Sequence, residues 1–184
     1  MIMQKTLTAS AIVLGMLASL GYTAVAQQTQ PTQPTVQSDA SRLSAADRQF
    51  MTKAAQAGMA EVRLGQLAAQ RGVSTSVKQY GQHMVDEHTT ANNQLMQLAT
   101  QKGVTLPSDI DAEHKAFRAR IGQIPGKRFD TTYINQMVKD HNKVIALFLQ
   151  ESQQGQDPDV RAFATKMLPT LREHLQRARQ TKIQ

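Results

Sequence analysis

Four segments of this chain carry apolar side chains at alternating intervals of three and four residues. That spacing places the apolar residues on one face of an α-helix, and such a face is stable only when it is buried against other helices. The segments run from about Ser44 to Arg71, Ser74 to Lys102, Asp130 to Gln154 and Asp157 to Ala178. Four amphipathic helices of this length predict an all-α fold, a four-helix bundle.

Residues that favour helix termini stand at the ends of these segments. Ser44 with Asp47 matches a capping box, and Asp157 followed by Pro158 matches an N-cap with proline in the first turn. Asp130 is predicted to cap the third long helix. Gly72 is predicted to end the first helix in the left-handed conformation, as glycine does after many helices.

The connection between the second and third long helices is much longer than the other two. It extends from Gly103 to Phe129 and contains its own predicted helix, about Asp109 to Ile121. A connection of this kind crosses from one end of a bundle to the other. Two helical hairpins joined by such a crossover predict a ferritin-like bundle over residues 43–182, with its first and last helices parallel. Gly81 is expected to let a neighbouring helix approach closely.

The N-terminal segment has the pattern of a secretory signal peptide. Lys5 precedes an apolar run from Leu7 to Leu20, and Ala24–Ala26 matches a cleavage site. We expect residues 1–26 to be removed after Ala26, and residues 27–42, rich in Gln, Thr and Pro, to form a disordered tether. The predicted location is the periplasm or the extracellular space.

The amino-acid composition excludes several kinds of functional site and of binding partner. The chain has no cysteine, which excludes disulfides, iron–sulfur clusters and a thiol nucleophile. Its formal net charge is +7, but no nucleic-acid-binding motif accompanies the basic residues, so we predict no nucleic-acid partner. Weak contact with an anionic envelope surface stays open. No segment after Ala26 is apolar enough to cross a membrane, and no motif specifies a protein partner.

Each long helix carries one titratable residue in the middle of its apolar face. A buried polar group that has no partner costs several kcal/mol, so such residues are normally paired, hydrogen-bonded or bound to a metal. Counting from the predicted turns, with a rise of about 1.5 Å per residue, places the four residues within roughly one helical turn of one level. They are Glu61, His88, His141 and His174.

Further candidate ligands surround these four residues in the sequence. An acidic residue directly precedes each histidine, and we expect its carboxylate to be able to orient an imidazole of a neighbouring helix by a hydrogen bond. Methionines precede two of the histidines by one turn on the same faces. These candidates are Glu87, Asp140 and Glu173 for the carboxylates, and Met84 and Met137 for the thioethers.

Two hypotheses explain the polar residues. Three imidazoles and one carboxylate suit an iron, copper or zinc ion, and the methionine sulfurs would favour Cu(I); haem is a less favoured occupant. Alternatively, the residues form a buried hydrogen-bond network that only fixes the packing of a structural envelope protein. His83 and His114 are predicted to be peripheral. Catalytic motifs are absent, including the E-x-x-H pattern of di-iron bundles, so we predict no catalytic residues and favour a protein that is not an enzyme.

Four stretches resemble a bacterial family of secreted ferritin-like proteins known as domain of unknown function 4142. They are MAEVRLGQLAAQRG, VKQYGQHMVDEHTTANNQLMQLATQKGVTLP, FDTTYINQMVKDHNKVIALF and LPTLREHLQRA, and the resemblance extends from Ala45 to Ala178. It implies a signal peptide, an all-helical bundle and a location in the envelope or outside the cell. The recurring positions of the family correspond to Glu61, His88, Asp140, His141 and His174. The family has no established activity to transfer.

Overall fold

The computed structural model describes residues 43–184, and the predicted signal peptide and tether lie outside this range. The described residues form five helices and no strand. The helices are α1 (Ala45–Arg71), α2 (Thr75–Gln101), α3 (Ala112–Ile121), α4 (Lys127–Gln154) and α5 (Pro158–Gln180). The predicted boundaries are therefore correct to within a few residues for each element.

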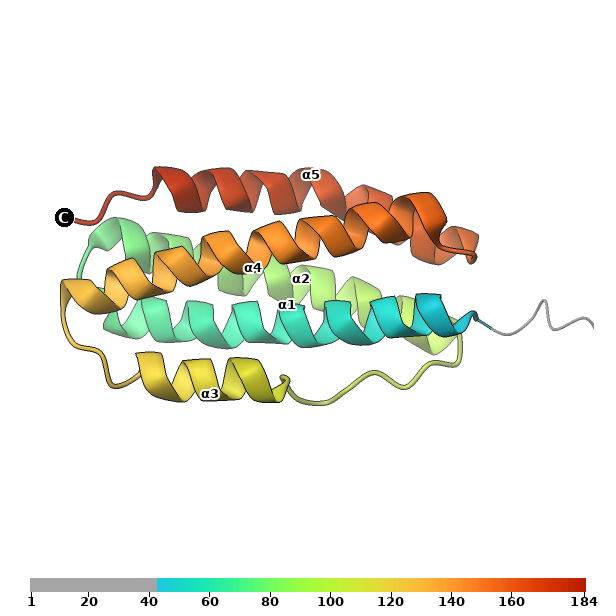
Figure 1. Ribbon diagram of the computed structural model, residues 1–184, viewed down its shortest axis with the longest axis horizontal. Coiled ribbons are helices and arrows are strands. Elements are labelled where there is room, and N and C mark those ends of the chain that lie inside the picture. The colour runs from blue at the N-terminus through green and yellow to red at the C-terminus, as the bar shows by residue number, and fades with distance from the viewer. Residues whose placement is uncertain (1–42) are drawn as a thin grey trace, which may run out of the picture. The chain divides into compact units, whose positions relative to one another are not determined.

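The four long helices form two antiparallel hairpins, α1–α2 and α4–α5, that pack side by side (Figure 1). The connection that contains α3 runs back along the bundle, so that α2 and α4 are parallel and α1 and α5 are parallel. This is the ferritin-like arrangement that the long crossover predicts. Within residues 43–184, no helix combines the length and the apolar character that crossing a membrane requires.

The turn after α1 differs from the prediction for Gly72. Its φ of −52° and ψ of 142° are those of an extended residue, so the predicted left-handed conformation is wrong. Only three residues separate α1 from α2, and an extended backbone spans that gap directly. Glycine serves there by its small size, because a Cβ atom would lie 2.7 Å from the carbonyl oxygen of Ala68.

Asp130 does not cap its own helix. The helix begins earlier than predicted, at Lys127, with Gly126 as the N-cap at a φ of 61°. The fully buried Asp130 carboxylate instead accepts hydrogen bonds from the backbone N–H groups of Val73 and Ser74, at 2.9 and 2.8 Å. An aspartate on α4 therefore satisfies the start of α2.

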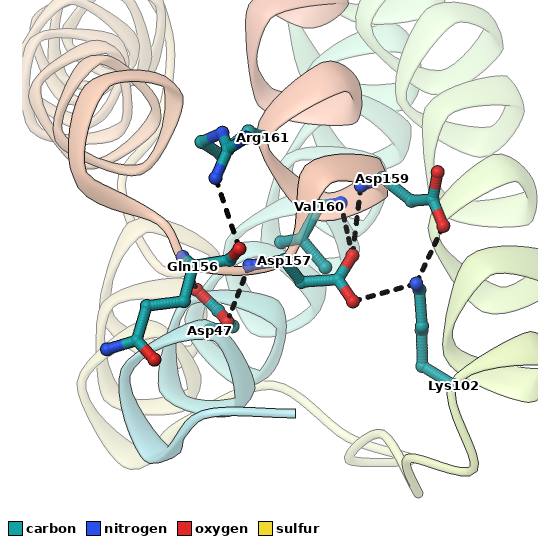
Figure 2. Close-up of polar contacts among 7 residues, drawn as sticks. All are labelled: Asp47, Lys102, Gln156, Asp157, Asp159, Val160 and Arg161. Carbon is teal, nitrogen blue, oxygen red and sulfur yellow. Dashed lines mark hydrogen bonds and ion pairs between the residues drawn. The ribbon is translucent and has the colours of Figure 1, made fainter. Parts of the chain in front are cut away.

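Asp47 has the matching role at the other hairpin. The Ser44 hydroxyl accepts from the N–H of Asp47, as the predicted N-cap requires. The Asp47 carboxylate does not complete a capping box, because it accepts from the N–H groups of Gln156 and Asp157, at 2.9 and 3.1 Å (Figure 2). Burial opposes ionisation of Asp47, but these hydrogen bonds outweigh it and lower the pKa of the carboxyl group.

A third polar contact joins the two hairpins near the same turn. Asp157 is the N-cap of α5 and accepts from the N–H groups of Asp159 and Val160. Its second oxygen lies 2.7 Å from the Lys102 ammonium group, which also reaches Asp159 at 2.6 Å (Figure 2). The C-terminal end of α2 is thereby attached to the start of α5.

Helices α1 and α2 approach most closely at two glycines. A Cβ on Gly65 would lie 2.6 Å from the carbonyl oxygen of Gly81, and a Cβ on Gly81 would lie 2.7 Å from the carbonyl oxygen of Gly65. The prediction that a helix approaches Gly81 is confirmed, and the partner is α1. No other residue type fits this contact without moving the backbones apart.

The apolar core is divided into two clusters along the bundle axis. One lies toward the α4–α5 turn and includes Phe50, Leu95 and Phe148. The other lies toward the α1–α2 turn and includes Leu64, Met84, Tyr133 and Met137. In every long helix, the predicted polar residue falls between the segments that build these two clusters.

Candidate metal centre

Four polar side chains from four helices occupy the level between the two apolar clusters. Glu61, His88, His141 and His174 are only 3, 7, 1 and 2 % exposed. The three imidazoles each offer a nitrogen atom, and these nitrogens lie within 4.8 Å of one another. The ring centroids are 5.1 to 5.7 Å apart. The structure thus brings together the residues that the apolar faces single out.

His141 is held by the backbone of its own helix. Its Nδ1 lies 2.8 Å from the carbonyl oxygen of Met137. Because a carbonyl can only accept, Nδ1 carries the proton and Nε2 carries the lone pair. Metal-ligating histidines usually have this arrangement, in which one ring nitrogen donates to a carbonyl and the other faces the metal.

Glu61 approaches the same ring without replacing that hydrogen bond. Its Oε1 lies 3.7 Å from Nδ1 of His141, beyond ordinary hydrogen-bond distance. Its Oε2 is buried and has no hydrogen-bond partner in the described structure. The carboxyl group therefore adjoins the imidazoles but does not pair with them.

The remaining nitrogen atoms of the cluster are also unpaired. Within residues 43–184, Nε2 of His88, Nε2 of His141 and both ring nitrogens of His174 are buried and have no hydrogen-bond partner. Leaving a buried polar atom unpaired typically costs about 1–3 kcal/mol. A network that serves only packing would pair these atoms with one another, and no hydrogen bond joins the four side chains.

Burial keeps the three imidazoles neutral. It lowers the pKa of His174 to about 3, with a further contribution from the neighbouring His141. Burial likewise lowers the pKa of His88 well below its usual value, and that of His141 to a smaller extent. Neutral imidazole is the form that binds metals, so no proton has to be displaced at pH 7.

Glu61 stands between the interior and a surface cleft. It lines the central cavity together with the three histidines, and it also lines a cleft of about 440 Å³ beside α3 that includes His114 and Asp140. Burial and the charge of Asp140 raise the pKa of Glu61 well above its usual value. A bound cation would reverse that effect by stabilising the carboxylate.

The predicted carboxylate partners of the imidazoles lie elsewhere. Glu173 is exposed and pairs with Arg177, and Glu87 is exposed at the rim of the cavity. Asp140 is buried but accepts from the Gln136 amide at 2.8 and 2.9 Å. A position one residue before a histidine is rotated by about 100° on the helix, which turns these side chains away from the three imidazoles. The Met137 carbonyl takes the orienting role instead.

The predicted soft ligands are not at the cavity either. Met84 and Met137 are completely buried in the apolar cluster nearer the α1–α2 turn. A different methionine, Met167 of α5, lines the cavity together with the three histidines. The structure therefore offers three imidazoles and one carboxylate, with a thioether on the cavity wall.

His83 is closer to the centre than the sequence indicates. Its ring lies 5.3 Å from that of His174, and its Nε2 is buried without a partner in the described structure. His83 does not belong to the apolar stripe of α2, so the sequence pattern places it on the solvent side of that helix. Helix α5 packs against this side of α2 and covers it. His114 remains outside the group of three histidines, and the carboxylates of Asp140 and Asp111 raise its pKa to about 9.

Comparison with known proteins identifies the family of this chain and a solved structure with a similar fold. Residues 32–181 match the family described as Domain of unknown function (DUF4142). No curated protein matches the sequence. A crystal structure of a DUF305 fragment from Deinococcus radiodurans is similar, with a TM-score of 0.67 and 16 % identity over 76 % of this chain and 96 % of the other. At that identity the similarity demonstrates the shared helical fold alone.

Proposed function

Because the chain belongs to the DUF4142 family, whose description assigns no activity, we propose its function from the site itself: it binds one transition-metal ion in the core of the bundle. His88, His141 and His174 are the proposed ligands, and Glu61 is a fourth ligand or a base beside the ion. The observation that carries the proposal is the set of three buried imidazole nitrogens within 4.8 Å.

A small movement of the side chains would bring the three imidazole nitrogens to the separation that metal coordination requires. Zinc binds imidazole nitrogen at about 2.0–2.1 Å, so tetrahedral ligands would lie about 3.4 Å from one another. The present separation of up to 4.8 Å needs a contraction that side-chain rotation can supply. Binding would also satisfy the buried nitrogens that have no partner.

The donor set favours zinc, copper or iron over other ions. Imidazole suits all three metals, and a site of three protein ligands with an open fourth position is typical of functional rather than structural zinc. Haem does not suit the site, because the cavity has a volume of about 40 Å³. Pockets for large organic ligands measure about 300–1,000 Å³.

We further propose that the protein acts in the periplasm or outside the cell. The support is the sequence pattern of residues 1–26, in which an apolar run precedes Ala24–Ala26. A protein without cysteine has no thiolate ligand, and imidazole and carboxylate are then the main side chains that bind zinc, copper or iron, which matches the proposed site. Mass spectrometry of the protein from the culture medium and from cell fractions would test both the cleavage and the location.

The experiment for metal binding is direct. The purified protein is stripped with a chelator, loaded separately with zinc, copper and iron, and assayed for bound metal and for melting temperature. We expect one equivalent of metal and a raised melting temperature, since a ligand that binds only the folded state stabilises it. The H141N variant should lose the metal, whereas an H83N variant should keep it. Absence of stoichiometric metal with an unchanged melting temperature would refute the proposal.

A structural role for the cluster is the second candidate. Its support is the bond from His141 to the Met137 carbonyl together with the edge-to-face packing of His141 and His174, which orient the rings without any ligand. In that case the protein would be a non-catalytic envelope protein whose polar core specifies one packing. Metal would then change neither its stability nor its spectra.

A further inference from the structure

The cavity beside the polar cluster extends in one direction only. Apart from the four cluster residues and the exposed Glu87 at the rim, every residue that lines it lies on the α4–α5 turn side of the cluster in its helix. On the opposite side, Leu64, Met84, Tyr133 and Met137 are at most 1 % exposed and fill the core. A metal ion held by the three imidazoles would therefore be closed off on one face and face open space on the other.

Small side chains create this open space. Ala54, Ala57, Gly58 and Ala91 line the cavity from α1 and α2. Ala57 and Gly58 lie one turn from Glu61, and Ala91 lies one turn from His88, at positions where larger apolar residues would fill the core. Gly58 is constrained by its neighbour, because a Cβ there would lie 2.0 Å from the side-chain oxygen of Asn92.

The size of the cavity limits what can occupy it. A water molecule needs about 10–15 Å³ of cavity volume. The volume of about 40 Å³ accommodates a metal ion and a ligand of two or three heavy atoms, and nothing larger. An amino acid, a nucleotide or a sugar does not fit.

The apolar side chains that line the cavity favour an uncharged ligand over a charged one. Leu95, Phe148 and Leu171 line the cavity beyond the imidazoles and are 2, 6 and 6 % exposed. These side chains offer no hydrogen bond to replace the hydration that a charged ligand would lose, so only the metal ion could compensate it, whereas an uncharged ligand loses little hydration on entering. At the polar end, Oε2 of Glu61 is buried without a hydrogen-bond partner in the described structure and can hydrogen-bond to a bound molecule.

We infer that the metal ion binds a small uncharged diatomic molecule, of the size and polarity of dioxygen, at a coordination position that opens into this cavity. This inference rests on the proposed metal binding and adds the class of ligand. In this inference, Ala91 and Leu171 form the cavity wall that limits the size of the ligand. The open coordination position then serves to bind that ligand, whereas a protein that only stores the ion would not need one.

Carbon monoxide is the probe for this inference, because it is uncharged, diatomic and binds Cu(I) through carbon. The protein is loaded anaerobically with Cu(I), its copper content is measured, and the carbonyl stretching band is then recorded by infrared spectroscopy. We expect one copper and one copper-bound carbonyl. If none of copper, iron and zinc binds, the proposed function fails; if copper binds and no carbonyl band forms, or if only another of these metals binds, only the present inference is overturned.

Two substitutions locate the ligand in the cavity. A91L adds three carbon atoms to the wall and should weaken carbon monoxide binding at least tenfold while one copper is retained. The matched control is A146L, which adds the same atoms at an exposed position of α4 five residues after His141. Unchanged carbon monoxide binding in copper-loaded A91L would overturn the inference.

A variant that enlarges the cavity covers the case in which A91L does not fold or does not hold copper. L171A removes a wall from α5 without touching a proposed ligand, and it should retain copper and bind carbon monoxide at least as tightly as the unmodified protein. It should in addition admit ethyl isocyanide, whose four heavy atoms exceed what the unmodified cavity accommodates. Exclusion of ethyl isocyanide from copper-loaded L171A would contradict the assignment of this wall.

Discussion

Asp47 and Asp130 make the same contact at opposite hairpins. Each lies in the first turn of the first helix of its hairpin, and each carboxylate accepts two backbone N–H groups from the turn of the other hairpin. Both carboxylates are fully buried. The two halves of the bundle are thereby related by an approximate twofold arrangement in which each one closes the other's turn.

The same relationship extends to the candidate metal site. Glu61 and Val144 both lie fourteen residues after their aspartate, and Gly58 and His141 both lie eleven residues after it. All four line the cavity. Each pair therefore contributes one polar residue of the cluster and one apolar residue or glycine of the cavity wall.

We predict that D47N and D130N each lower the free energy of unfolding by about 1–3 kcal/mol, because an amide offers only one acceptor to two buried N–H groups. Urea denaturation followed by circular dichroism would measure the loss. D86N is the control, since Asp86 is exposed and its carboxylate accepts a hydrogen bond from Gln82 of its own helix. A change below about 0.5 kcal/mol, the range of ordinary surface substitutions, would contradict the role of either aspartate.

The glycine contact between α1 and α2 gives a second prediction. G65A and G81A should each destabilise the protein by about 1–3 kcal/mol, because the added methyl group meets the backbone of the facing helix. The double variant should lose less than the sum, since one separation of the helices relieves both clashes. Thermal unfolding of the three variants tests this. A gain of stability, which Gly→Ala shows where there is room, would refute the contact.

The neutral histidines predict sensitivity to mild acid. A buried histidine with a lowered pKa contributes stability above its unfolded pKa of about 6.5, and this contribution is lost as pH falls toward the folded value. For His174 the folded pKa is about 3, so the loss should begin near pH 6.5 and continue to about pH 3. Melting temperatures of the metal-free protein from pH 8 to pH 4 would reveal it. A melting temperature that stays constant between pH 6.5 and pH 5 would contradict this prediction.

For Glu151 we predict a loss of stability as pH rises, the opposite of the pH dependence predicted for the histidines. Burial and the neighbouring Asp47 raise the pKa of Glu151 to about 7. A carboxyl group with a raised folded pKa favours the folded state when it is protonated, so its contribution declines as pH rises from about 4.5 to about 7. E151Q should therefore raise the melting temperature at pH 8 and leave it nearly unchanged at pH 4.5. An equal effect at both pH values would show that ionisation of Glu151 is not the cause.

The triple variant H88L/H141L/H174L separates metal binding from packing. Replacing buried polar groups that lack partners with apolar ones is often neutral or stabilising, so the metal-free variant should melt at the same temperature or higher. It should show no stabilisation by zinc, copper or iron, whereas the unmodified protein should. A variant that fails to fold would indicate that the imidazoles contribute essential hydrogen bonds to the core.

The position of the site along each helix could be predicted because helical geometry is regular. The apolar spacing identifies the inner face, and the constant rise per residue sets the level, so Glu61 and the three histidines can be placed from the sequence. Ser44 and Asp157 were predictable as N-caps for a similar reason, since their bonds reach only the next few residues.

Contacts between helices decided the rest. The partners of Asp47 and Asp130 lie in the other hairpin, and His83 approaches His174 because α5 covers a flank of α2 that its own sequence pattern assigns to solvent. The sequence by itself determined that Glu61 and the three histidines face inward and at what level, through the period and the rise of the helix. Only the tertiary structure decided which inward groups meet and where space remains, because both depend on how closely neighbouring helices pack.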